Sequence, residues 1–78
     1  MVIKLNTIID VQDFVELCNC KKYLYNNIDV KQGRQVIDGR SILGIYSLNL
    51  LKPLDVVIDY GKYESDFYSN IKKWKVDR

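Results

Sequence analysis

The sequence predicts an α+β domain in which three helices cover one face of a four-stranded antiparallel sheet, in the order β-α-β-β-α-β-α. Two kinds of apolar spacing carry this prediction. Some segments alternate apolar and polar residues as strands do, and others repeat apolar residues every three or four positions as helices do. The chain has 78 residues, of which 47% are hydrophobic and 28% charged, so a single domain spanning residues 1–78 is expected.

The N-terminal part of the chain predicts a strand followed by a helix. Apolar and polar residues alternate over residues 2–8, with Ile3 and Leu5 as the expected buried pair. Asp10 is expected to open the helix as its N-cap, because a carboxylate can accept hydrogen bonds from the free backbone amides there. The apolar face of this helix is then formed by Val11, Phe14, Val15 and Cys18.

The middle of the chain predicts a β-hairpin. The period of two runs from Tyr23 to Gln32, and because Asn26 interrupts it, the strand proper is expected to start near Asn27. Residues 32–34 are expected to form the turn, and residues 35–38 the return strand.

A short and unusually apolar helix is expected next. Ser41 is a favourable N-cap, and the helix should end near Asn49 because Pro53 disfavours helix just before it. Its apolar residues are Ile42, Leu43, Ile45, Tyr46 and Leu48. Unless this helix is sandwiched between the sheet and its neighbours, some of these residues must be exposed, and exposed apolar patches often mark partner surfaces.

The C-terminal part predicts a last strand and a last helix. Residues 54–59 read as a strand, and Gly61 separates it from a helix over residues 63–75. The inner stripe of that helix consists of Tyr63, Phe67, Ile71 and Trp74.

The composition argues against catalysis. The chain contains no histidine, which excludes a Ser-His-Asp triad and removes the imidazole ligand of many metal sites. Cys18 and Cys20 lie two positions apart, which is not a CxxC spacing, and the four glycines are isolated and form no phosphate-binding loop. The carboxylates are scattered along the chain. We therefore expect neither an enzyme nor a bound metal or cofactor.

Charge and hydropathy bear on partners and location. The net charge of +2 is too small to indicate a nucleic-acid or membrane partner by itself. The chain has no apolar run long enough to span a membrane, and its first residues do not resemble a signal peptide. A cytoplasmic location is the expectation that follows.

The segment from Arg40 to Leu48 closely resembles the second-helix signature of HPr, the phosphocarrier protein of the bacterial sugar phosphotransferase system. Its order is a basic residue, a serine, two apolar residues, a small residue, two more apolar residues, a small hydroxyl residue and a leucine. The resemblance covers residues 28–58 and is weak elsewhere. It implies the open-faced β-sandwich of that family, which has the element order derived above.

The resemblance also implies a loss of function. In the family, a phosphorylated histidine lies at the start of the first helix, followed by Ala-Arg-Pro. Counting back from Ser41 places Asp10 at the position of the histidine and Gln12 at that of the arginine. A carboxylate does not carry a phosphoryl group at that site as imidazole does, and Asp10 and Asp13 would repel phosphate. We therefore expect no phosphotransfer through a histidine.

The second helix remains as the expected functional part. In one branch of the family a kinase phosphorylates the serine that matches Ser41, and the product binds a transcriptional regulator. Either Ser41 is only a helix cap, or it is also a regulatory site, with Arg40 supplying a contact to the phosphate. The residues that correspond to the family's partner-docking patch are Arg40, Ile42, Leu43 and Tyr46.

Nucleic-acid binding is a second hypothesis for the function, of a different class from protein docking. Tyr23 and Tyr25 on one strand face, together with Lys31, would resemble a base-stacking surface for RNA or single-stranded DNA. The C-terminal residues Lys72, Lys73 and Lys75 would add positive charge to it.

Overall fold

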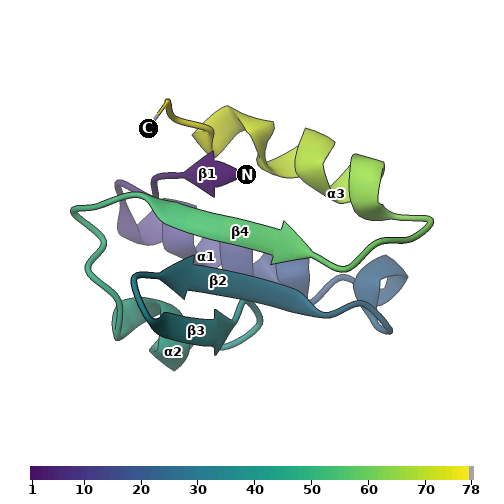
Figure 1. Ribbon diagram of the computed structural model, residues 1–78, viewed down its shortest axis with the longest axis horizontal. Helices are drawn as coiled ribbons and strands as arrows, with labels where there is room; N and C mark the ends of the chain where they lie inside the picture. The colour runs from purple at the N-terminus through teal and green to yellow at the C-terminus, as the bar shows by residue number, and fades with distance from the viewer. Residues whose placement is uncertain (78) are drawn as a thin grey trace.

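The computed structural model describes residues 1–77 and confirms the α+β class and the predicted element order (Figure 1). Its strands are β1 (Val2–Ile3), β2 (Ile28–Gln32), β3 (Gln35–Asp38) and β4 (Leu54–Ile58). Its helices are α1 (Ile8–Cys18), α2 (Ile42–Tyr46) and α3 (Glu64–Ile71), with the 3₁₀ turns η1 (Lys21–Tyr23) and η2 (Lys72–Trp74). The strands form one open antiparallel sheet in the order β1-β4-β2-β3.

The hairpin between β2 and β3 agrees with the sequence prediction. Gln32 pairs with Gln35, and between them Gly33 has a φ of 59°, a left-handed conformation that glycine adopts without steric cost. On the other side of β2, Val30 pairs with Val56 of β4. β4, the last strand in the sequence, therefore lies between β1 and β2 in the interior of the sheet.

One face of the sheet is buried and the other is open. The side chains that point to the buried face belong to the same hydrophobic core as those of the helices; they are Ile28, Val30, Leu54, Val56 and Ile58. Between them Asp29, Lys31 and Asp55 alternate onto the opposite face, where they are partly or fully exposed. In Figure 1, α1 and α2 lie behind the sheet, and α3 runs along the side of β1.

The first strand and the first helix begin differently from the prediction. β1 ends at Ile3, although Leu5 is buried as expected. The N-cap of α1 is Thr7, not Asp10, and the helix begins at Ile8. The Thr7 hydroxyl accepts a hydrogen bond from the Asp10 amide at 3.0 Å, and the Asp10 carboxylate accepts one from the Thr7 amide at 3.2 Å. This reciprocal capping box needs the acidic residue at the third helical position, so Asp10 is the box partner rather than the cap.

The predicted placement of Tyr23 beside Tyr25 on a strand face is wrong. Residues 21–23 form the 3₁₀ turn η1, and β2 starts only at Ile28, close to the predicted start near Asn27. Tyr23 is fully buried, whereas Tyr25 is 95% exposed. Alternation alone could not separate a strand from a turn here, because the core contact of Tyr23 is made with α3, which lies far away in sequence.

The C-terminal helix is shorter than expected and continues as η2. Of its predicted inner stripe, Phe67, Ile71 and Trp74 are buried and Tyr63 is partly buried. Beyond η2 the chain runs beside β1: the Lys4 amide donates to the Trp74 carbonyl at 3.0 Å, and the Val76 amide donates to the Val2 carbonyl at 3.1 Å. Residues 74–76 thus cover the edge of the sheet at β1.

Candidate functional site

The second helix exposes much of its apolar surface, which decides between the two alternatives that the sequence left open. Ile45 and Leu48 are buried in the core, whereas Leu43 is 80% exposed, and Ile42 and Tyr46 are also exposed. The start of α1 and the loop after α2 add two more exposed residues, Ile8 and Leu51. We call these residues the α2 surface; they are Ile8, Ile42, Leu43, Tyr46 and Leu51.

A groove of about 370 Å³ lies within this surface, between the start of α1 and the segment that follows α2. Leu5, Val11 and Leu48 line it from the core side, and Ile8, Tyr46 and Leu51 line it from the outside. The groove joins two segments that are separate in the sequence. Sequence reasoning did not include Ile8 or Leu51, although the apolar pairs Ile8-Ile9 and Leu50-Leu51 at helix and loop ends were a visible signal.

A side-chain amide fixes the loop that carries Leu51. The Gln32 amide nitrogen donates to the Asn49 carbonyl at 2.8 Å, and its oxygen accepts from the Asn49 amide at 2.8 Å. These two bonds anchor the loop to the end of β2. They therefore hold the outer wall of the groove in place against the sheet.

Ser41 is the N-cap of α2, as predicted. Its hydroxyl oxygen accepts a hydrogen bond from the Gly44 amide at 3.0 Å, and its side chain is exposed. A Cβ atom at Gly44 would lie 3.1 Å from the Ser41 Oγ and 3.3 Å from the Ile37 Cδ1, so glycine permits the close approach of α2 to β3. The hydroxyl is thus accessible at the edge of the α2 surface.

Arg40 makes contacts within the domain that the sequence did not predict. Its guanidinium donates to the carbonyl oxygens of Tyr23 at 2.5 Å and Asn26 at 2.8 Å, and lies 3.7 Å from the Asp38 carboxylate. These contacts fasten the chain between η1 and β2 to the start of α2. The geometry therefore gives Arg40 a structural role, and its contact with a phosphate or partner stays a prediction.

Asp10 is engaged on both carboxylate oxygens. One accepts from the backbone amides of Asn6 and Thr7, and the other accepts from the Trp74 indole at 3.3 Å. Desolvation opposes ionisation, but the hydrogen bonds from Asn6, Trp74 and Thr7 outweigh it and hold the pKa of Asp10 below its ordinary value. Gln12 is exposed on the next turn of α1. The carboxylate therefore stabilises the helix start as an anion.

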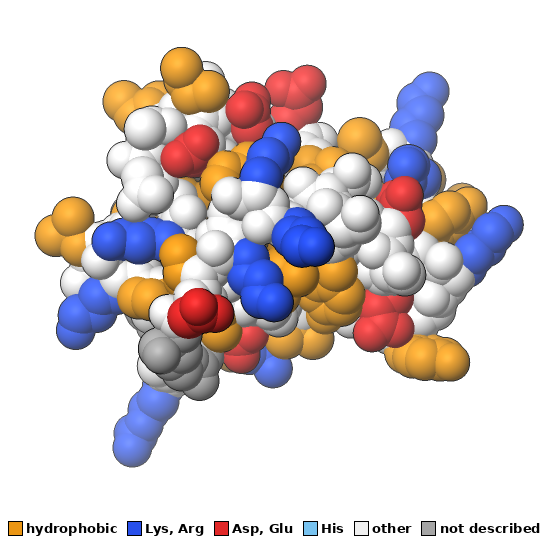
Figure 2. All heavy atoms as spheres, turned by 90° about the horizontal axis from the view of Figure 1, so that it is seen from above, with side chains coloured by type: hydrophobic (Ala, Val, Ile, Leu, Met, Phe, Trp, Pro, Cys, Tyr) orange, Lys and Arg blue, Asp and Glu red, His pale blue; other side chains and the backbone are white. Residues whose placement is uncertain are grey.

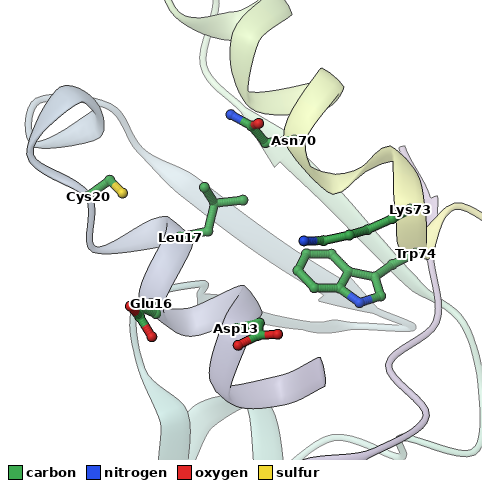
Figure 3. Close-up of a pocket in the computed structure, with 7 residues that line it drawn as sticks. All are labelled: Asp13, Glu16, Leu17, Cys20, Asn70, Lys73 and Trp74. Atoms are coloured by element: carbon green, nitrogen blue, oxygen red, sulfur yellow. The ribbon is translucent and has the colours of Figure 1, made fainter. Parts of the chain in front are cut away.

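A second hollow, of about 300 Å³, lies between α1 and the C-terminal helix (Figure 3). Asp13 and Glu16 line it from α1, and Asn70 and Lys73 from the other side, with Trp74 between them. Cys20 is exposed at its end, whereas burial raises the pKa of the Cys18 thiol to about 12, which leaves Cys18 unreactive. Among residues 1–77, no group of His, Cys, Asp and Glu side chains is arranged to hold a metal ion.

Over the same part of the chain, none of the helices has the length and apolar character required to cross a membrane. Comparison with protein-family models, with curated proteins and with solved structures finds no match to this chain.

Proposed function

We propose that this chain is an HPr-like adaptor domain that docks a protein partner through the α2 surface and has lost histidine phosphotransfer. The observation that carries the proposal is that Tyr46 of α2, Ile8 of α1 and Leu51 of the following loop line one groove, while Ile42 and Leu43 are exposed on the same helix α2. Three separate segments contribute, so the patch is larger than a single helix of five residues could provide. The Arg40–Leu48 resemblance and the element order support the family assignment.

The physical basis of docking is the burial of apolar area. Removing exposed apolar surface from water stabilises a complex by about 25 cal/mol per Å² before the costs of association. Leucine and isoleucine supply most of the α2 surface, and Tyr46 adds an aromatic side chain of the kind enriched at interface cores. A concave apolar groove beside an exposed leucine suits a folded protein that inserts an apolar side chain.

Regulation through Ser41 is the second part of the proposal. A phosphate on this exposed hydroxyl would add a charge of about −1.5 to −2 beside Ile42 and Leu43. Such a charge strengthens docking to a basic partner and weakens docking to an apolar one. Because the contacts of Arg40 hold it elsewhere, the charge would act on the partner rather than within the domain.

The first prediction concerns phosphotransfer. Incubation with phosphoenolpyruvate and the phosphotransferase-system donor enzyme is expected to leave the mass of the intact chain unchanged, because no imidazole is present and the carboxylate of Asp10 is engaged in hydrogen bonds. Intact-mass spectrometry makes the measurement, with an active HPr as the positive control. A gain of one phosphate would contradict the prediction.

The second prediction concerns docking. Replacing Leu43 by aspartate is expected to weaken partner binding at least about tenfold, because a charge would be buried in the interface. The partner is identified by photo-crosslinking from position 42 in cells, and its affinity for each variant is measured by calorimetry with purified proteins. Ser41→Asp, which retains a good N-cap, is expected to change the affinity without lowering stability.

The matched control for this experiment is Leu24→Asp. Leu24 is 63% exposed but lies after η1, outside the α2 surface. The Leu24→Asp variant is expected to bind the partner with an affinity within about twofold of that of the unmodified chain, because the substitution is remote from the interface. Equal losses in the Leu43 and Leu24 variants, or no loss in either, would overturn the docking proposal.

A further inference from the structure

A third hollow, of about 340 Å³, lies where the C-terminal segment runs beside β1. Its lining residues are Lys4, Asn6, Asp10, Lys73, Trp74, Lys75 and Val76. Backbone pairing brings them together from opposite ends of the chain. The Lys4 amide donates to the Trp74 carbonyl at 3.0 Å, and Ile3 is bridged to Lys75. This pairing fixes the backbone of Lys4 next to that of Lys75.

The hollow has an excess of positive charge. Three lysines line it against one carboxylate, which gives +2 (3 − 1) for the lining residues. Within residues 1–77, none of the three lysines lies within 4.0 Å of a carboxylate. Asp10, whose oxygens accept hydrogen bonds from the amides of Asn6 and Thr7 and from the Trp74 indole, supplies the one negative charge in this sum. Figure 2, which looks onto α3 and the C-terminal segment, shows Lys and Arg side chains near the centre of this face, with Asp and Glu side chains around them.

We propose that this hollow binds a phosphate group, presented as inorganic phosphate or as a small phosphomonoester. Near pH 7 a phosphomonoester carries about −1.5 to −2 charges, which matches the charge of the lining residues. The ammonium groups of neighbouring lysines repel each other, and a multiply charged anion bound between them attracts each of them. Ammonium groups with three donors each suit the oxygens of phosphate.

The remaining lining groups help to define the site. The Lys73 ammonium lies 4.7 Å from the centre of the Trp74 ring, a cation–π contact, and Lys73 also lines the hollow of Figure 3 together with Asp13 and Glu16. Lys4 is only partly exposed, so its charge is less screened by water than that of a fully exposed lysine. Asn6 offers an amide donor at the rim. The hollow shares only Asn6 with the groove of the α2 surface, so this inference does not depend on the docking proposal.

The experiment uses Trp74, which is the only tryptophan in the chain, as the reporter. The full chain is titrated with inorganic phosphate and, separately, with O-phosphoserine, while sodium chloride keeps the ionic strength constant. The nitrogen–proton NMR signal of the Trp74 indole is expected to shift with saturation in at least one titration. Equal affinities would assign the site to the phosphate group alone, and tighter binding of phosphoserine would assign it to a monoester.

Two double variants that lose the same charge make the test specific. K4Q/K75Q is expected to weaken phosphate binding by about five- to twenty-five-fold, because two ion pairs are lost and each exposed pair contributes up to about fivefold. K31Q/K62Q, with lysines on the open sheet face and in the loop before α3, is expected to change it less than about twofold. A shift that does not saturate, or an equal loss in both variants, would overturn the proposal. Unchanged backbone spectra establish that both variants are folded.

Discussion

Replacing Tyr23 by alanine is expected to lower the free energy of unfolding by about 3–5 kcal/mol, the usual effect of truncating a buried aromatic side chain. Tyr23 is fully buried, and its ring packs edge-on against Phe67 at 5.2 Å and Tyr63 at 6.3 Å between centroids. Its hydroxyl donates to the Asp66 carboxylate and accepts from the Asn70 amide. The residue therefore joins η1 to α3 through both packing and hydrogen bonds.

Tyr25→Ala is the matched control, because Tyr25 is 95% exposed and two positions away. It is expected to change stability by less than about 0.5 kcal/mol. Urea unfolding followed by circular dichroism measures both variants. Since a domain of this size has a total stability of about 4–12 kcal/mol, Tyr23→Phe is included as a milder variant, with an expected loss of about 1–2 kcal/mol. If the alanine variants were equally stable, the assignment of Tyr23 to the core would be wrong.

This prediction also bears on the nucleic-acid hypothesis. A side chain that is fully buried cannot stack on a base without local unfolding, so Tyr23 cannot belong to such a surface in this fold. Burial, followed by the hydrogen bond to Asp66, raises the pKa of the Tyr23 phenol to about 12. The hydrogen bonds from Tyr23 and Lys22 lower the pKa of Asp66 in turn. Tyr23 and Asp66 are thus a structural pair.

Arg40→Met is expected to lower the free energy of unfolding by about 2–4 kcal/mol, since two backbone carbonyls would lose their charged donor. Those carbonyls belong to Tyr23 and Asn26, and the Arg40 side chain is only 23% exposed. Methionine retains much of the aliphatic packing, so the loss reports on the hydrogen bonds. Denaturant unfolding measured at several protein concentrations provides the value.

Arg34→Met serves as the control for Arg40, because Arg34 is exposed in the turn between β2 and β3. Its effect is expected to stay below about 0.5 kcal/mol. Arg40→Lys should recover only part of the lost stability, as a single ammonium cannot reproduce a planar guanidinium fork. A methionine variant as stable as the Arg34 variant would instead favour the original prediction that Arg40 serves a partner or a phosphate.

Local patterns predicted the elements well where neighbouring residues determine the structure. The β2–β3 hairpin, the Ser41 cap and the apolar excess of α2 follow from turn chemistry, capping and spacing within ten residues or so. The start of α1 was missed by a few residues, because Thr7 and Asp10 are both good capping residues and the reciprocal box decides between them.

By itself, the sequence determined the α+β class, the order of the elements, the absence of imidazole chemistry and the apolar excess of α2, whereas the exposure of that excess was left open between two alternatives. Only the tertiary structure decided which partners the polar groups find. It assigned Arg40 to two carbonyls of the η1–β2 segment, buried Tyr23 against α3, and brought Lys4 beside Lys75. The physical reason is that periodicity and capping are local effects, whereas these contacts join residues far apart in the chain, whose approach depends on how the sheet and helices pack.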